Sequence, residues 1–248
     1  RARLAHRQVV LGRFIAVRGS SGYPVAALLE ATDLWKSYDG AGYVLREVDL
    51  KLDSGEGMVV WGRNGSGKTT LLNLLGGLDW PDRGEILFRA RDLAGLTPRE
   101  QAALRLNEVG FVFQDHNLLD ELTVRQNVQL PLRLRRVPNM AERGEELLRR
   151  FGLMEMAERR PPALSMGERQ KTAVARALAN EPAIILADEP TAALDEVSAP
   201  DLLNLLEGLR EEGRTVILAS HDPLARALSW KVRRLRDGRL RPEGEGEG

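Results

Sequence analysis

Three short runs of apolar residues along the chain have the pattern of buried parallel strands. They cover residues 58–61, 183–187 and 215–219. None of them alternates between apolar and polar positions, and continuous apolar runs of this length are typical of strands that are covered on both faces. A polar motif follows each run. The pattern therefore predicts a parallel sheet with polar side chains at the carboxyl ends of its strands.

Helical periodicity connects these runs. After the first run, leucines recur near the 3.6-residue period of a helix, and Gly76 and Gly77 weaken its end. These leucines are Leu71, Leu72, Leu75 and Leu78. Between the second and third runs, Ser198 is a candidate N-cap for another helix. Its apolar positions are Leu202, Leu205, Leu206 and Leu209. A strand, a helix and a parallel strand in this order form a crossover unit, so we expect an α/β core.

The segment from about residue 115 to 163 differs because it is rich in Leu, Arg and Glu, and residues 141–150 within it favour a helix. We expect an inserted helical subdomain there, within one domain that spans residues 29–240. Residues 1–28 contain five arginines and no acid, which predicts a flexible basic extension, with a binding arm as the alternative. Residues 241–248 form an acidic Gly/Glu tail that cannot bury a core.

Composition limits the kinds of partner and site. The 248 residues include 36 basic and 36 acidic side chains, so the formal net charge is zero. We therefore expect no nucleic acid as partner and a local site for any phosphate. The absence of cysteine excludes disulfides and thiol chemistry, and three histidines are too few for a histidine-rich metal site. No run approaches the roughly 20 apolar residues that span a bilayer. Arg13 and Arg18 interrupt the N-terminal apolar stretch, so we expect no export signal.

A glycine-rich segment follows the first predicted strand. Residues 62–69, Gly-Arg-Asn-Gly-Ser-Gly-Lys-Thr, satisfy the phosphate-loop spacing G-x-x-x-x-G-K-[ST]. The glycines let backbone N–H groups point inward, and the next helix adds its positive N-terminal end. Lys68 is expected to reach the β- and γ-phosphates of a nucleotide, and the Thr69 hydroxyl to bind Mg²⁺. The flanking strand and helix disfavour the alternative, an ordinary Gly-rich turn with a surface lysine.

Two adjacent acids end the second predicted strand. Asp188 and Glu189 follow Ile-Ile-Leu-Ala, at the edge where α/β sheets bind ligands. We expect Asp188 to hold Mg²⁺ through its water shell, and Glu189 to polarise the water that attacks the γ-phosphorus. Alone, the pair equally suits a solvated acidic turn before Pro190. Together with the phosphate loop, hydrolysis is the better explanation.

Two further side chains are candidates for the same site. His221 follows the third predicted strand, although a lone histidine is more often packed or exposed than catalytic. If the third strand lies beside the second, His221 reaches the same sheet edge, where its imidazole can bond a γ-phosphate. Gln114, after the apolar residues 111–113, is a candidate for contact with metal or water. An ordinary loop position is the open alternative for Gln114.

The segment Leu-Ser-Met-Gly-Glu at residues 164–168 predicts the start of a helix. Ser165 and Glu168 have the spacing of a capping box. The exposed N-terminus of such a helix is also a phosphate site. One nucleotide does not need two helix N-termini from one chain, so we expect a second copy to supply this one, with the nucleotide between subunits.

Taken in order, these motifs resemble the ATP-binding cassette (ABC) ATPases, the nucleotide-hydrolysing subunits of ABC transporters, over residues 29–240. The resemblance implies an α/β fold with a P-loop NTPase core of ABC-ATPase type and an inserted helical subdomain. It implies ATP and Mg²⁺ as cofactors, and ATP hydrolysis coupled to transport. It also implies a head-to-tail homodimer, transmembrane permease subunits as partners, and a cytoplasmic position on the inner face of the cell membrane.

The resemblance also implies roles for individual residues. Tyr38 matches the aromatic side chain that stacks on adenine. The loop residues implied to bind ATP are Gly62, Asn64, Gly65, Ser66, Gly67, Lys68, Thr69 and Thr70. Catalytic roles are implied for Glu189, His221, Gln114 and Lys68, and Mg²⁺ binding for Thr69, Gln114 and Asp188. Contact with the ATP of a second subunit is implied for Ser165, Gly167, Glu168 and Asp195.

A narrower resemblance, carried by residues 77–81, 117–128 and 131–132, is to the ATPases of lipoprotein-releasing, macrolide-exporting and cell-division complexes.

Met166 departs from the family, which usually has glycine at that position. A bulky side chain near the γ-phosphate predicts slower hydrolysis or weaker dimerisation. The alternative function is therefore a regulatory module that dimerises on ATP with low turnover. A chromosome-maintenance or translation-type cassette fits poorly because the chain has a single cassette.

Overall fold

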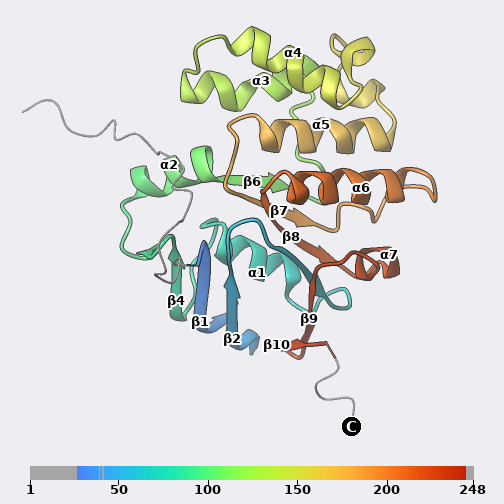
Figure 1. Cartoon of the computed structure of the whole chain (residues 1–248). Coiled ribbons are helices and arrows are strands. Elements are labelled where there is room, and N and C mark those ends of the chain that lie inside the picture. Colours follow the sequence, from blue (N-terminus) through green and yellow to red (C-terminus); the bar gives the residue numbers. More distant parts are fainter. Residues whose placement is uncertain (1–26, 39, 41, 244–248) are drawn as a thin grey trace, which may run out of the picture.

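The parallel sheet predicted from the three apolar runs is present (Figure 1). The computed structural model describes residues 27–38, 40 and 42–243. Its larger sheet has the strand order β10-β9-β3-β8-β7-β6, in which β10 alone runs antiparallel to its neighbour. The strands are β3 (Gly57–Trp61), β6 (Val109–Val112), β7 (Ile184–Asp188), β8 (Thr215–Ser220), β9 (Lys231–Arg236) and β10 (Arg239–Pro242). The predicted strands β3, β8 and β7 are thus neighbours.

A second, antiparallel sheet was not expected from the apolar runs. Its order is β2-β1-β4-β5, with β1 (Leu29–Ser37), β2 (Tyr43–Leu52), β4 (Arg83–Phe88) and β5 (Arg91–Asp92). In β2, Val48, Leu50 and Leu52 are buried and the residues between them are exposed. This alternation marks a strand with one face in water. Helix α1 (Lys68–Leu75) packs in the core between the two sheets.

Helices cover the other face of the parallel sheet. α5 (Met166–Leu178) and α6 (Ser198–Glu211) lie next to the sheet, α3 (Val124–Arg135) packs on α5, and α4 (Met140–Arg150) packs on α3. Figure 1 shows α3 and α4 beyond α5, inside the segment 115–163 that was expected to form a helical subdomain. Short 3₁₀ turns at Met154–Met156 and Pro161–Ala163 lead into α5. Two further helices in the described part of the chain are α2 (Pro98–Glu108) and the short α7 (Pro223–Arg226).

Helix α1 ends earlier than its leucine pattern predicted. Leu71, Leu72 and Leu75 are buried as expected, but the helix stops at Leu75, and Leu78 lies outside it with 45% of its surface exposed. Gly76 forms the C-cap, where an added Cβ would lie 2.0 Å from Cζ of Phe111. Only glycine fits this close packing against Phe111. The helix ends at this glycine, so the prediction that Leu78 belongs to the helix was wrong.

The cap of α6 also differs from the prediction. Ser198 is the first residue of the helix rather than its N-cap, and Val197, which holds the N-cap position, makes no side-chain capping hydrogen bond. The carboxylate of Asp195 accepts hydrogen bonds from the backbone N–H groups of Ser198 at 2.7 Å and Val197 at 3.1 Å. These bonds to Ser198 and Val197 lower the pKa of Asp195. Asp195 therefore performs the capping role because the chain enters the helix through a turn that starts three residues earlier.

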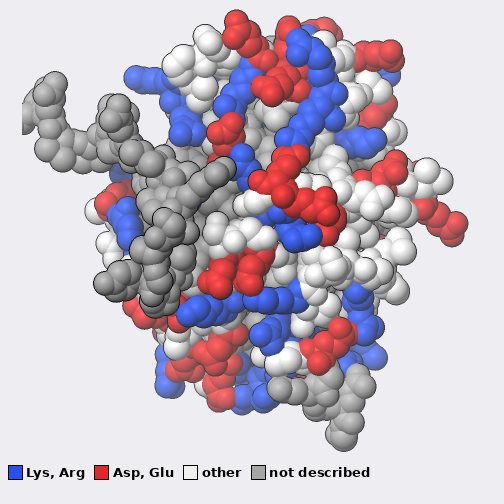
Figure 2. Space-filling view, in the orientation of Figure 1, with Lys and Arg blue, Asp and Glu red and all other residues white. Residues whose placement is uncertain are grey.

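The described part of the chain begins and ends close to the predicted limits of the domain. Leu28 is buried and β10 runs to Pro242, while residues 1–26 and 244–248 lie outside the described part, so the limits 29–240 stay a prediction. Within the described residues, no helix has the length and apolar character needed to cross a membrane. Basic and acidic side chains intermingle on the face that Figure 2 shows. On that face, a phosphate would be bound by a local site rather than by a broad basic surface.

Candidate functional site

The phosphate loop joins β3 to α1 at the carboxyl edge of the sheet. Gly65 and Gly67 have φ angles of 78° and 100°, a left-handed conformation that favours glycine. Gly67 is the residue before α1, and the helix starts without a side-chain cap. Its first backbone N–H groups therefore remain available beside the loop, which is the arrangement that binds phosphate oxygens.

Lys68 lies beneath this loop with only 5% of its surface exposed. Its Nζ donates hydrogen bonds to the carbonyl oxygens of Gly62 at 2.8 Å and Arg63 at 3.1 Å. The same ammonium group lies 2.8 Å from Oε1 of Glu189. The buried positive charge is thus balanced by a buried carboxylate, and a phosphate that binds Lys68 has to compete with Glu189.

Glu189 and His221 meet because their strands are neighbours. β7 pairs in parallel with β8, which confirms that the third predicted strand lies beside the second. Glu189 follows β7 with a left-handed φ of 45°, and its N–H donates to the carbonyl of Ala219 at 2.9 Å. His221 follows β8, and its Nδ1 lies 2.9 Å from Oε1 of Glu189. The backbone N–H of His221 donates to Oε2 of Glu189 at 3.3 Å, so both carboxylate oxygens are oriented.

Asp188 and Thr69 form a second pair at the same edge. The Thr69 hydroxyl donates to Oδ2 of Asp188 at 2.6 Å, and Oδ1 of Asp188 is buried without a hydrogen-bond partner. Burial raises the pKa of Asp188 and the nearby Glu189 charge adds to the rise, against the opposing effect of Thr69 and Lys68. Carboxylate and hydroxyl oxygens are the ligands that Mg²⁺ prefers. The unpartnered oxygen of Asp188 fits that ion, although within the described residues no three His, Cys, Asp or Glu side chains gather around it.

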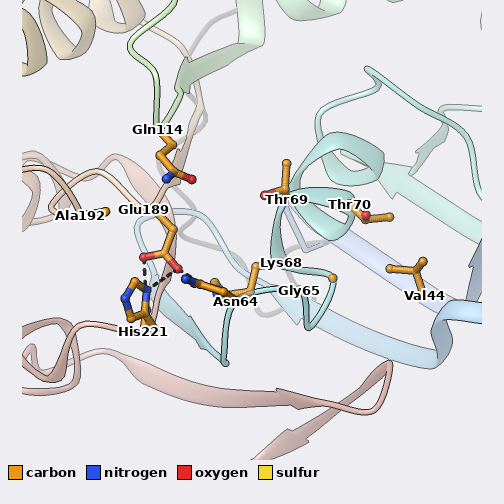
Figure 3. Close-up of a pocket in the computed structure, with 11 residues that line it drawn as sticks. Val44, Asn64, Gly65, Lys68, Thr69, Thr70, Gln114, Glu189, Ala192 and His221 are labelled. Atoms are coloured by element: carbon orange, nitrogen blue, oxygen red, sulfur yellow. Dashed lines mark hydrogen bonds and ion pairs between the residues drawn. The ribbon is translucent and has the colours of Figure 1, made fainter.

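Lys68, Thr69, Glu189 and His221 line one cavity of about 510 Å³, whereas Asp188 lies behind Thr69 and is not part of its lining (Figure 3). Gln114 enters it from the segment after β6, on the side of Glu189 away from His221, while the loop and α1 form another wall. Its lining residues are Val44, Asn64, Gly65, Gly67, Lys68, Thr69, Thr70, Gln114, Glu189, Ala192 and His221. The structure therefore brings most of the predicted phosphate-loop and catalytic residues together around one space. Sequence reasoning missed Val44, whose signal was the alternation along β2, and Ala192.

A larger cavity of about 1150 Å³ adjoins the first, because both are lined by Val44, Asn64, Gly65 and His221. Gly62, Ser66 and Tyr38 line this second space. Tyr38 is 43% exposed, and its hydroxyl donates to Oδ2 of Asp79 at 2.6 Å. The ammonium of Lys36 lies 5.0 Å from the centre of the Tyr38 ring. Asp79 and Lys36, which the sequence did not point to, therefore hold the ring at the wall of the cavity.

The residues expected to reach a second subunit lie elsewhere. Ser165, Gly167, Glu168 and Asp195 line neither cavity. The capping box is confirmed, because Oγ of Ser165 accepts from the N–H of Glu168 at 3.3 Å and the Ser165 N–H donates to Oε2 of Glu168 at 2.8 Å. Gly167 lies beside α6, where an added Cβ would be 3.4 Å from Oγ of Ser198. Met166 is 39% exposed at the start of α5.

Comparison with known proteins agrees with this geometry. The family model described as ABC transporter matches residues 45–192, more than half of the chain. The bacitracin export ATP-binding protein BceA of Halalkalibacterium halodurans is 40% identical over 86% of this chain and 87% of its own length. The macrolide export ATP-binding/permease protein MacB 1/2 of Paracoccus denitrificans is 42% identical over 89% of this chain. The match covers 33% of that relative, so the chain spans about a third of its length.

Solved structures give the same result. The dimeric post-hydrolysis state of the ATP-binding cassette MJ0796, bound to ADP and Pi, has a TM-score of 0.80 and 36% identity, over 86% of this chain and 96% of that one. The structure of cbiO1 from Clostridium perfringens, part of the ABC transporter complex cbiONQ, has a TM-score of 0.78 and 28% identity, over 87% of both chains. The fold, the phosphate loop with its facing acids, and these matches establish that the chain belongs to the ATPases of the ABC transporter family.

Proposed function

We propose that this ATPase closes as a head-to-tail dimer around two ATP molecules with Mg²⁺ and drives a conformational change in a membrane permease. One observation carries the proposal. Lys68, Glu189 and His221 converge on one cavity, whereas the N-terminus of α5, which has the features of a phosphate site, lines neither cavity. A second copy of the chain would complete each cavity with that helix end.

The two cavities suit the parts of ATP. The loop N–H groups and Lys68 would bind the phosphates in the smaller cavity, with Asn64, Thr69 and Thr70 on its walls. Tyr38 on the wall of the larger cavity would stack on the adenine ring, and its hydrogen bond to Asp79 fixes the ring in advance. A pre-positioned ring loses little freedom when the base arrives, which favours binding.

The chemistry follows from the contacts of Glu189. When a phosphate takes the ammonium of Lys68, Oε1 of Glu189 loses one of its two partners, keeps only His221 at 2.9 Å, and becomes available to accept a proton from water. That water would attack the γ-phosphorus, and His221 beside Glu189 would donate to a γ-phosphate oxygen. Thr69, Asp188 and Gln114 would hold Mg²⁺, which supplies neutralisation of the phosphate charge.

The second subunit would contribute the start of α5. The backbone N–H groups after Ser165 point along the positive end of the helix, and Gly167 leaves room for a phosphate to approach. Glu168 and Asp195 would lie at the same interface. A relative supports this arrangement, because two solved structures of the cassette MJ0796 are described as dimeric.

A mixture of two inactive variants tests the head-to-tail site. Lys68→Ala removes the phosphate contact, and Gly167→Asp places a negative charge where the partner's γ-phosphate would sit. An aspartate in the first turn favours the helix, so the second variant is expected to fold. Each variant alone should have little turnover. Random pairing makes half of the dimers mixed, each with one intact site of two, so the mixture should recover about a quarter of wild-type turnover.

The control for this mixture is Gly167→Ala, which adds one methyl group and no charge. It should keep most of the turnover, since an added Cβ meets Oγ of Ser198 at an ordinary 3.4 Å. Steady-state phosphate release, measured for each variant and for the mixture, decides the result. A mixture no more active than its components, or a Gly167→Asp variant with wild-type turnover, contradicts the shared site.

The transport role rests on the relatives. Their names describe bacitracin export and macrolide export, and the macrolide proteins are ATP-binding/permease proteins. We infer that this chain works as an export ATPase at the inner, cytoplasmic face of the membrane, attached through a permease. Purification of the chain from detergent-solubilised membranes should yield an integral membrane protein at fixed stoichiometry. Recovery of a dimer without such a partner contradicts the transport role and favours the second candidate.

The second candidate is a regulatory module that dimerises on ATP with low turnover. Met166 is the observation that favours it, because this exposed side chain stands where the family usually has glycine. It would face the partner's γ-phosphate, where it would hinder close approach while its backbone N–H stays available. Low turnover together with strong ATP-dependent dimerisation is the pattern expected of such a module.

A further inference from the structure

We propose that Arg176 is a positioning residue that clamps the segment carrying Gln114 and ties it to helix α5. The inference rests on the role of Gln114 in the proposed function. Gln114 lines the smaller cavity, but it belongs to a long connection between β6 and α3 with no regular structure over residues 113–123. Side chains from other elements have to hold this connection in place if the Gln114 amide is to contact metal or water in a fixed geometry.

The backbone beside Gln114 is unusual. His116 and Asn117 both have left-handed φ angles, 62° and 48°, in succession. Residues other than glycine rarely adopt this conformation, and two in a row require support from their surroundings. His116 is buried, and burial lowers the pKa of its imidazole. Asp115 opposes this effect, while the charges of the nearby Arg169 and Arg176 lower that pKa further.

Arg176 supplies the support from α5. Its Nη2 donates to the carbonyl oxygen of His116 at 2.7 Å, and its Nη1 donates to the carbonyl oxygen of Asn117 at 2.5 Å. One planar guanidinium thus holds the carbonyls of both left-handed residues. Burial of this guanidinium lowers its pKa, and the two charge-assisted bonds compensate part of that cost. A lysine at this position has a single ammonium without the fixed fork and cannot reproduce the pair.

The other end of the connection is held by α3. Asn127 is fully buried, accepts a hydrogen bond from the N–H of Leu119 at 2.9 Å, and donates to the carbonyl oxygens of Leu119 at 3.0 Å and Leu122 at 3.2 Å. The connection therefore moves with two helices rather than independently. Of these two, α5 also begins at the Ser165 cap. Arg176 lies eleven positions after Ser165, roughly 16 Å along a rigid helix.

The clamp gives α5 a function beyond its N-terminus. In the proposed dimer, one end of α5 contacts the ATP of the partner, while Arg176 near the other end fixes the Gln114 segment of its own cavity. A small shift of the helix would then move the Gln114 amide relative to the phosphates. Arg176 would couple the two sites, because a movement of α5 on closure of one site would move the Gln114 segment of the other.

Arg176→Lys tests the clamp, with Arg135→Lys as the matched control. Arg135 also donates from Nη1 to a backbone carbonyl near the end of α5, that of Asn180 at 2.9 Å, but it does not contact the Gln114 segment. We expect Arg176→Lys to lower kcat by about tenfold to a hundredfold, because catalytic groups are sensitive to small misplacement. Nucleotide affinity and melting temperature should match those of Arg135→Lys, and Arg135→Lys should keep wild-type kcat.

A double-mutant cycle shows whether Arg176 acts through Gln114. In a Gln114→Ala background, Arg176→Lys should lower kcat by less than about twofold, since the group it positions is absent. Losses that multiply instead, or an equal loss in Arg135→Lys, overturn the proposal. So does a wild-type kcat for Arg176→Lys.

Hydrogen exchange tests the clamp without any dependence on hydrolysis. The amides of His116 and Asn117 donate within the connection, to the carbonyls of Phe113 at 3.0 Å and Asp115 at 2.6 Å. Their exchange should be faster in Arg176→Lys and unchanged in Arg135→Lys. Unchanged exchange in both variants overturns the clamp even if the chain hydrolyses ATP as proposed. Conversely, faster exchange with a failed mixing experiment would contradict the shared site and leave the clamp intact.

Discussion

Glu189→Gln is expected to lower ATP turnover by about 10²- to 10⁴-fold, the usual contribution of a general base. The amide of glutamine has the same shape as the carboxylate but does not accept a proton from water at neutral pH. Its oxygen can still accept the hydrogen bond from the N–H of His221, which is 3.3 Å from Oε2 of Glu189. The geometry at the end of β7 should therefore survive while the chemistry is lost.

The same substitution should strengthen nucleotide binding. In the ligand-free chain, Lys68 is paired with Oε1 of Glu189 at 2.8 Å, and both groups are buried. A phosphate has to displace that carboxylate before it can use the ammonium. Removal of the negative charge abolishes this competition and also reduces repulsion of the phosphates, so Glu189→Gln should bind ATP at least as tightly as the wild type.

Loss of turnover with retained binding should trap the ATP dimer. Light scattering coupled to gel filtration, with and without ATP and Mg²⁺, measures the dimer directly. Glu181→Gln is the control, because Glu181 is an exposed carboxylate paired with Arg143 on the surface and should behave as wild type. Wild-type turnover in Glu189→Gln rules out Glu189 as the base. Lost turnover without a trapped dimer leaves Glu189 as the base and contradicts the proposed closure on ATP.

The sequence predicted the parts of the fold that depend on local pattern. The runs at β3, β7 and β8 are buried on both faces, so their apolar composition was sufficient to identify them. The antiparallel sheet was missed because β2 shows its signal only as alternation around Val48 and Leu50. The end of α1 depended on contact between Gly76 and Phe111, which are far apart in sequence and therefore invisible to a helical period.

The candidate site was predictable as a set of residues but not as a set of contacts. Strand order placed Glu189 and His221 at one edge, since the carboxyl ends of neighbouring parallel strands meet there. The ion pair between Lys68 and Glu189 was not predicted. The phosphate-loop motif predicts which ligand atoms Lys68 contacts, and it does not indicate which side chain Lys68 contacts without a ligand. Arg176 was missed for a related reason. Its partners are the backbone carbonyl oxygens of His116 and Asn117. Every residue has such a carbonyl, so the sequence does not indicate which ones accept a hydrogen bond from an arginine.

Lys68→Ala is expected to have two large effects with different physical causes. Nucleotide affinity should fall by about 10²- to 10⁴-fold, because charge-assisted hydrogen bonds contribute about 1.5–3 kcal/mol each and Lys68 would make one to each of two phosphates. The ligand-free chain should also lose stability. Glu189 is only 6% exposed, and removal of its buried partner leaves a desolvated carboxylate, a change that costs about 3–5 kcal/mol.

The double variant Lys68→Ala with Glu189→Gln separates these two effects. Removal of both charges eliminates the unpaired carboxylate, so most of the lost free energy of unfolding should return, whereas nucleotide affinity should stay low. Urea unfolding without nucleotide measures the first quantity and calorimetric titration with ATP the second. His221, 2.9 Å from the same carboxylate oxygen, can partly replace Lys68 as a partner, which places the destabilisation toward the lower end of the range. If Lys68→Ala is as stable as the wild type, the Lys68–Glu189 pair is not a structural contact, and if its ATP affinity is unchanged, Lys68 does not bind the phosphates.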